Sequence, residues 1–71
     1  MNYSSVRSRN IDGVGYDFET STLGIRFLNG SEYHYLDVPD DIYNGLLQAE
    51  SPGKFLNKYV IKAGYSYRRI I

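Results

Sequence analysis

The chain has 71 residues, enough for one domain with a small hydrophobic core. It contains no cysteine, and this excludes disulfide bonds and zinc sites built on thiolates. No apolar run approaches the ~20 residues of a membrane span and the N-terminus lacks the apolar core of a signal peptide, so we expect a cytoplasmic protein.

Eight acidic and eight basic side chains balance over the whole chain, but not along it. Residues 1–50 hold all eight acids and three bases, whereas residues 51–71 hold five bases and no acid. Such an asymmetry is typical of a surface for an anionic partner. Acidic and basic parts that face each other within the fold would explain the same asymmetry.

The first part of the chain predicts a flexible segment followed by a strand. Residues 1–9 are polar and terminal, so we expect them to be flexible. Residues 11–18 place large apolar side chains on one face at a period of two, and this predicts a first strand. Gly13 and Gly15 mark a bulge or a close backbone approach in it.

Residues 23–35 predict a β-hairpin, because alternating runs flank Asn29-Gly30, the strongest short-range hairpin signal. Two registers are open. A two-residue Asn29-Gly30 loop puts the large side chains of the two strands on opposite faces, and a three-residue loop gathers them on one face. We favour the three-residue loop, which places Arg26 opposite Glu32 and leaves His34 on their side. In this register the apolar face carries Leu23, Ile25, Phe27, Tyr33 and Tyr35.

Two helix starts follow the hairpin. Pro39 at the first helical position, with two aspartates behind it, predicts a helix that runs to about Ala49. Gly45 within this helix indicates close packing against the sheet. Ser51 as a cap and Pro52 at the first position predict a second helix.

The pattern as a whole predicts an α+β fold. A three-stranded antiparallel β-meander packs against two short α-helices, and residues 65–71 are a candidate C-terminal edge strand. We expect residues 10–71 to form a single domain.

Catalytic and metal-binding patterns are absent from the sequence. It has no Gly-x-Ser-x-Gly motif, no His-Glu-x-x-His motif and no cysteine nucleophile. The only histidine, His34, is expected to be polar surface, and Asp40 and Asp41 are explained as helix-start residues. We therefore predict no enzymatic activity, no cofactor and no metal site.

Two groups of residues could bind an anion. Ser51, Gly53 and Lys54 combine free amides at a helix start with a lysine, although a plain Ser-Pro helix start explains them as well. The other group interleaves bases with aromatics, as proteins that bind single-stranded nucleic acid do. A solvated helix face and tyrosines that close the core would also account for it. Its members are Lys54, Lys58, Lys62, Tyr65, Tyr67, Arg68 and Arg69.

Several sequence blocks occur in a recognisable order, at residues 10–17, 23–35, 38–39, 43–47 and 51–55. Together they resemble the KTSC domain, a short module at the C-terminus of some lysyl-tRNA synthetases that also occurs as a small stand-alone bacterial or phage protein. The resemblance covers about residues 6–70. The family's central Tyr-x-Tyr falls on Tyr33 and Tyr35, its Ser-Pro-Gly-Lys block on residues 51–54, and its terminal Tyr-x-Tyr-x-x-Ile on Tyr65, Tyr67 and Ile70.

The resemblance implies RNA binding, by association with the synthetase, and no catalytic activity. It agrees with the hypothesis drawn from the basic and aromatic residues, which is weak, non-enzymatic binding of RNA or single-stranded nucleic acid. An alternative is a protein-interaction or homo-oligomerisation module, in which acidic and basic parts meet between chains. A third hypothesis is a small-nucleotide pocket at Ser51, Gly53 and Lys54 that sequesters its ligand.

Overall fold

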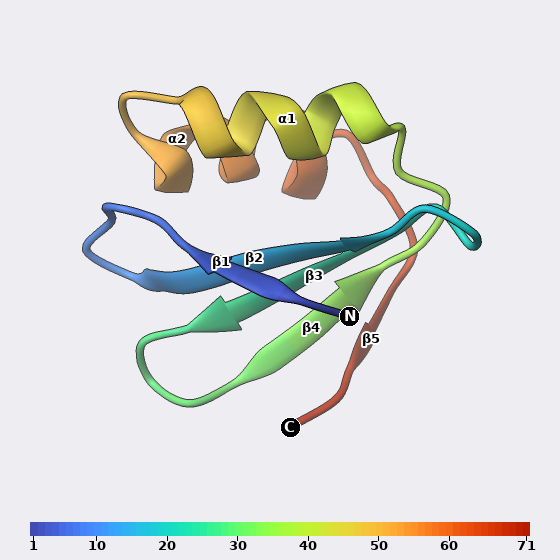
Figure 1. Ribbon diagram of the computed structural model, residues 1–71, viewed down its shortest axis with the longest axis horizontal. Helices are drawn as coiled ribbons and strands as arrows, with labels where there is room; N and C mark the ends of the chain where they lie inside the picture. Colours follow the sequence, from blue (N-terminus) through green and yellow to red (C-terminus); the bar gives the residue numbers. More distant parts are fainter.

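The computed structural model describes residues 1–71 and shows an antiparallel five-stranded sheet with helices on one face (Figure 1). The strands lie across the sheet in chain order. They are β1 (Tyr3–Ser5), β2 (Ile11–Asp17), β3 (Thr22–Phe27), β4 (Glu32–Tyr35) and β5 (Tyr67–Arg69). Between β4 and β5 the chain forms α1 (Asp40–Gln48), α2 (Pro52–Leu56) and the π-helical segment η1 (Asn57–Ile61). No helix has the length and apolar character needed to cross a membrane.

The predicted α+β class is confirmed, but the count of three strands is wrong. The candidate C-terminal edge strand is present as β5, which pairs with β4. The fifth strand, β1, lies within the segment expected to be flexible. Its residues have no apolar alternation, and its position comes instead from backbone pairing with β2, where Tyr3 lies opposite Gly15 and Ser5 opposite Gly13.

The hairpin between β3 and β4 has the three-residue loop. Leu23 lies opposite Tyr35, and Arg26 lies opposite Glu32. The Phe27 N–H donates to the Ser31 carbonyl at 2.9 Å and closes the loop. Gly30 has φ +96°, a left-handed conformation that glycine adopts without steric cost. The favoured register is therefore confirmed.

The glycines of β2 fulfil both predicted roles. The pairing of β2 with β3 shifts register between Ile11 and Gly13, which is a β-bulge. Gly15 is a site of close backbone approach, because a Cβ at this position would lie 2.7 Å from the carbonyl oxygen of Asn2.

The core lies between the sheet and the helical layer. The helical layer contributes Leu46 from α1, Leu56 from α2 and Val60 from η1, and the strands contribute most of the remainder. Tyr16 extends across this core, and its hydroxyl donates to the Val38 carbonyl. The buried hydrophobic residues are Ile11, Val14, Tyr16, Leu23, Ile25, Tyr35, Val38, Leu46, Leu56 and Val60.

The helix starts agree with the predictions to within one residue. Pro39 is the residue before α1, with extended backbone, rather than its first helical residue. Ser51 caps α2, and its Oγ accepts a hydrogen bond from the Lys54 N–H at 3.4 Å. Gly45 does pack closely, but against α2 and not against the sheet, because a Cβ there would collide with the ring of Phe55.

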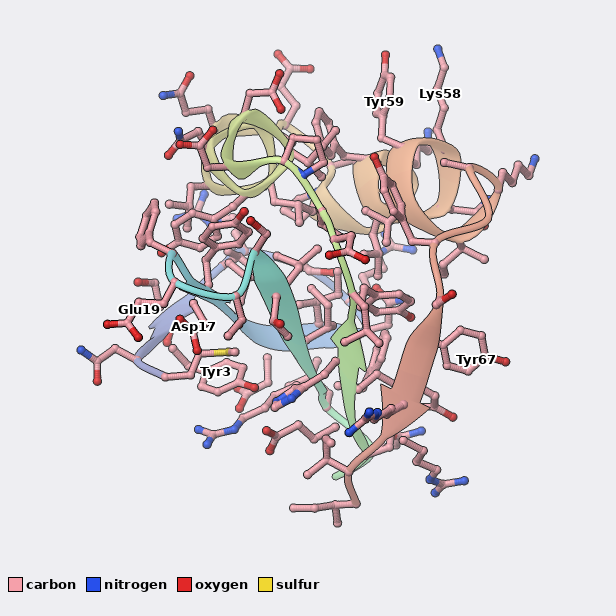
Figure 2. All side chains as sticks on the ribbon, turned by 90° about the vertical axis from the view of Figure 1, so that its right-hand side faces the viewer. Tyr3, Asp17, Glu19, Lys58, Tyr59 and Tyr67 are labelled. Carbon is pink, nitrogen blue, oxygen red and sulfur yellow. The ribbon has the colours of Figure 1, made fainter.

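The face of the sheet away from the helices carries a polar cluster around Glu32. Tyr3 lies on this side, as Figure 2 shows, and a Cβ at Gly24 beneath it would collide with its hydroxyl group. The Tyr3 hydroxyl donates to Glu32 Oε2 at 2.7 Å, and Arg26 Nε donates to Oε1 at 3.2 Å. His34 Nε2 lies 3.4 Å from Oε2, and the Arg26 guanidinium stacks 3.9 Å from the centre of the Tyr3 ring. The cluster provides hydrogen-bond donors for the carboxylate of Glu32, a residue that is only 9% exposed.

The cluster sets the protonation of Glu32. The hydrogen bond from Tyr3 holds the pKa of Glu32 below its usual value, and Arg26 adds to this effect while burial opposes it. Burial and the neighbouring Glu32 raise the pKa of Tyr3. The negative form of Glu32 is thus favoured in the folded state, so the cluster stabilises the fold above the unfolded-state pKa and loses this contribution as the pH falls.

We expect Tyr3→Phe to lower the free energy of unfolding at pH 7 by about 2 kcal/mol, since Glu32 loses a charge-assisted hydrogen bond. The deficit should shrink below about pH 4, where Glu32 becomes protonated in the unfolded chain and then in the folded chain. Urea unfolding at neutral and acidic pH measures both effects. Tyr59→Phe is the matched control, because Tyr59 is 42% exposed and lies on the helical layer, far from Tyr3 in Figure 2. A deficit that is the same at both pH values would contradict the role assigned to Glu32.

Candidate nucleic-acid interface

An aromatic pocket of about 550 Å³ opens between the β3–β4 hairpin, the end of η1 and β5. Tyr33 and Tyr35 reach it from β4, and Tyr65 and Tyr67 from the segment that leads into β5. Because opposite residues of antiparallel strands share a face, the pairing of Tyr35 with Tyr67 brings these two groups together. The pocket residues are Phe27, Asn29, Ser31, Tyr33, Tyr35, Ile61, Gly64, Tyr65 and Tyr67. We call this hollow the aromatic pocket.

The rings of the aromatic pocket contact one another, and their exposure increases from the core to the surface. The Tyr33 and Tyr35 rings are stacked with centres 6.4 Å apart, and the Tyr67 ring lies 5.8 Å from each of them. Phe27 meets Tyr33 edge-on at 5.8 Å. Tyr35 is 6% exposed and Tyr67 is 62% exposed, so the cluster runs from the core to the surface. Figure 2 shows Tyr67 at the outer edge of the sheet.

Polar and basic groups lie at the edge of the aromatic pocket. Asn29 Oδ1 accepts hydrogen bonds from Ser31 N–H and Oγ–H at 2.9 and 2.7 Å. This leaves the amide NH₂ group of Asn29 as a donor. Arg69 lies opposite Tyr33, and its guanidinium carbon is 5.9 Å from the centre of that ring. The pocket therefore combines π faces, a hydrogen-bond donor and a positive charge.

The remaining predicted binding residues lie on other surfaces. Arg68 lies opposite His34, on the sheet face that carries the Glu32 cluster. Lys58 points away from the sheet, with its Nζ 5.2 Å from the centre of the Tyr59 ring (Figure 2). Lys62 donates its N–H to Asn57 O at 2.9 Å in the wider π turn, so it does not lie in line with Lys54 and Lys58 as it would in a regular α-helix. Of the seven residues, the structure gathers Tyr65, Tyr67 and Arg69 around the aromatic pocket.

The predicted anion site lies at a second hollow, of about 840 Å³, between the β1–β2 loop and the start of α2. Ser51, Gly53 and Lys54 line it, and the Ser51 hydroxyl is used for the helix cap. The structure adds Arg7 and Arg9, which sequence reasoning placed in a flexible segment. No local signal could have found them, because the contact joins residues more than 40 positions apart.

Intramolecular pairing does not account for the charge asymmetry of the sequence. The structure contains the ion pair Arg26–Glu32 and the contact between His34 and Glu32, and no base of residues 51–71 takes part in either. These five basic side chains are exposed. No three His, Cys, Asp or Glu side chains lie close enough together to hold a metal ion.

Comparison with known proteins identifies the fold. The family model of the KTSC domain matches residues 7–65. A crystal structure of a KTSC domain protein from Yersinia pestis superimposes with a TM-score of 0.87 and 34% identity. That likeness covers 99% of this chain and 97% of the other, so it includes the edge strands β1 and β5. The resemblance found in the sequence is thereby confirmed.

Two relatives of similar length and one much longer protein are similar in sequence to this chain. A protein of Tsukamurella paurometabola is 42% identical over 55 residues, which are 78% of this chain and 82% of that protein. An uncharacterized protein of Stutzerimonas stutzeri is 33% identical over 99% of both chains. The lysine–tRNA ligase of Nostoc punctiforme is 35% identical over 60 residues, which are 84% of this chain but 10% of the ligase.

The buried end of the aromatic pocket allows a prediction about the ionisation of Tyr35. Burial raises the pKa of the Tyr35 phenol, and the neighbouring Tyr33 and Tyr67 add to the effect. The neutral phenol is thus favoured in the folded state, and its contribution to stability is lost only as the pH rises above the ordinary value of about 10. In a spectrophotometric titration, Tyr35→Phe should remove one group that ionises above this value. In urea the two proteins should differ by one group with an ordinary pKa, and the same ordinary value in the native protein would contradict burial of the phenol.

Proposed function

This chain belongs to the KTSC domain family, and we propose that it binds single-stranded RNA by stacking a base on the tyrosines of the aromatic pocket. The observation that carries the proposal is the convergence of four tyrosines from two distant segments on one surface hollow. Stacking of a base on an aromatic side chain contributes ~1–3 kcal/mol and tolerates any base, because every base has a π face. A duplex keeps its bases stacked internally, so the pocket favours single strands.

The charge around the pocket supports an anionic ligand. Arg69 lies beside Tyr33, its Nε donates to the Ile71 carbonyl oxygen at 3.1 Å, and it forms no ion pair with an Asp or Glu side chain. The Tyr35 phenol keeps its proton at neutral pH, as a tyrosine with the ordinary pKa of about 10 does, and burial raises its pKa further, so the buried end of the pocket adds no negative charge. Phosphates near the pocket would therefore meet a positive and not a negative field.

The comparisons support RNA as the nucleic acid. One relative is named a lysine–tRNA ligase, and the matched part is about a tenth of it. We propose that the shared module contributes RNA contacts there and here. Binding without catalysis is our proposal for this chain, because its only histidine lies on the opposite sheet face, held by Glu32 and Tyr3.

We expect Tyr67→Ala to weaken binding of a short single-stranded RNA by roughly 5- to 100-fold, the loss that removal of one stacking ring produces. Fluorescence anisotropy with a labelled oligonucleotide at about 50 mM salt measures the affinity. Tyr59→Ala is the matched control, since Tyr59 is also an exposed tyrosine but lies on the helical layer (Figure 2). Equal affinities of Tyr67→Ala and the native chain would refute base stacking in the pocket.

The basic part of the interface has a separate signature. Arg69→Gln should reduce the slope of log affinity against log salt by about one, because one phosphate contact is lost. Arg68→Gln removes the same charge from the adjacent residue on the other sheet face, and it should leave the slope unchanged. If both variants lower the affinity equally, the effect comes from net charge and not from a phosphate placed beside Tyr33.

The open edge of β5 favours a second candidate function, self-association. All three residues of β5 are exposed, and Ile70 and Ile71 behind it are 46% and 67% exposed. An edge strand presents backbone N–H and C=O groups that another chain can pair with, although β5 has only three residues and two of them are arginines. A sedimentation mass above that of the monomer, without RNA and at both low and high salt, would favour this function, because salt does not weaken backbone and apolar contacts. A monomeric mass at both salt concentrations would exclude it.

A further inference from the structure

The second hollow is a polar cavity that the base-stacking function does not use. It lies where the loop between β1 and β2 passes beneath α2, at the left of Figure 1. Eight of its ten lining residues have polar or charged side chains, and the other two are Pro52 and Gly53. Three of them are cations, Arg7 and Arg9 from the loop and Lys54 from α2. We call this hollow the basic cavity.

Hydrogen bonds hold the loop in the shape that forms the cavity. The Ser8 hydroxyl accepts from the N–H groups of Asn10 and Ile11, at 3.3 and 3.2 Å, and donates to Asn10 Oδ1 at 2.9 Å. The next residue, Ile11, is 1% exposed and anchors the loop in the core. Asn10 Oδ1 would lie 2.9 Å from a Cβ at residue 53, so Gly53 permits the loop to approach α2. Two segments distant in sequence are thus fixed against each other.

The charges of the cavity are not compensated within the chain. Arg7, Arg9 and Lys54 are exposed, and none of them forms an ion pair. Glu50 is the only carboxylate on the lining, and it too has no ion-pair partner. Three like charges around one hollow repel one another, and an anion placed between them removes this repulsion. Arginine in particular offers paired donors that match phosphate oxygens.

From this arrangement we propose that the basic cavity binds a ligand with two or more phosphate groups. The volume of about 840 Å³ and the three cations exceed what a single phosphate needs. Two sources share this chemistry, the diphosphate of a free nucleotide and successive phosphates of an RNA strand. The site goes beyond the proposed function, because it includes none of the tyrosines of the aromatic pocket.

Inorganic pyrophosphate is the probe for the first test. In an amide chemical-shift titration of the full chain, we expect shifts at Gly53, Lys54 and Asn57 and none at Tyr65 or Tyr67. Arg7→Gln combined with Arg9→Gln should weaken pyrophosphate binding roughly tenfold or more, since two charge-assisted contacts are lost. Absence of shifts, or shifts spread over all basic residues, would overturn the proposal.

A matched control separates a built site from diffuse charge. Lys58→Gln combined with Arg68→Gln removes the same net charge from two residues that do not line the cavity, and it should keep the native affinity for pyrophosphate. An equal loss in both double variants would overturn the proposal. Since all four side chains are exposed, each variant should retain the native spectrum, which the same measurement shows.

Competition then identifies the source of the phosphates. Displacement of pyrophosphate by adenosine diphosphate but not by single-stranded RNA supports a free nucleotide, and displacement by RNA supports successive phosphodiesters. Displacement by neither overturns the assignment to a phosphorylated ligand. Tyr67→Ala should bind pyrophosphate as the native chain does, so failure of base stacking and failure of the cavity are separately visible.

Discussion

The three-residue turn at Gly30 is the constraint on which both faces of the sheet depend. A register one residue away would turn Tyr33 and Tyr35 to the face opposite Leu23 and Ile25, and the core would lose its contact with β4. The observed register puts the tyrosines beneath the helical layer and Glu32 on the other face. Because β5 pairs with β4, the same register decides that Tyr67 and Arg69 join the aromatic face. The aromatic pocket is therefore a consequence of one turn.

The two faces of the sheet carry different side chains, and their roles differ accordingly. On the open face, Gly24 leaves room for the Tyr3 side chain to lie over the sheet and reach Glu32, so a side chain of the edge strand β1 covers part of this face. On the helical face, the helices cover the middle of the sheet and leave the β4–β5 edge to the aromatic rings. The polar groups on the open face, around Glu32, form their hydrogen bonds with one another. The aromatic edge keeps exposed rings and an arginine, Arg69, that has no Asp or Glu partner.

The sequence predicted correctly those features that depend on contacts between residues close together in the chain. Asn29-Gly30 and the Ser51 cap act within a few residues, and the structure has both. Strand β1 was missed because its pairing uses backbone groups and glycines of β2, which carry no apolar pattern. The grouping of the site residues was only partly predictable. Tyr67 and Arg69 meet Tyr33 through strand pairing, while Arg68 between them faces the other way because strand side chains alternate.

The neutral net charge of the chain does not oppose binding of an anion, because the basic side chains of residues 51–71 are exposed and form no ion pair within the chain. Figure 2 places Asp17 and Glu19 on one side of the molecule and Lys58 and Tyr67 on the other. Exposed basic side chains attract a polyanion locally even when the net charge is zero. The helical segment also connects the two hollows, since Asn57 lines the basic cavity and Ile61, at the end of the same π turn, lines the aromatic pocket. Both hollows are built on this one segment. Their functions can therefore be separated only by variants of exposed residues that line one hollow and not the other.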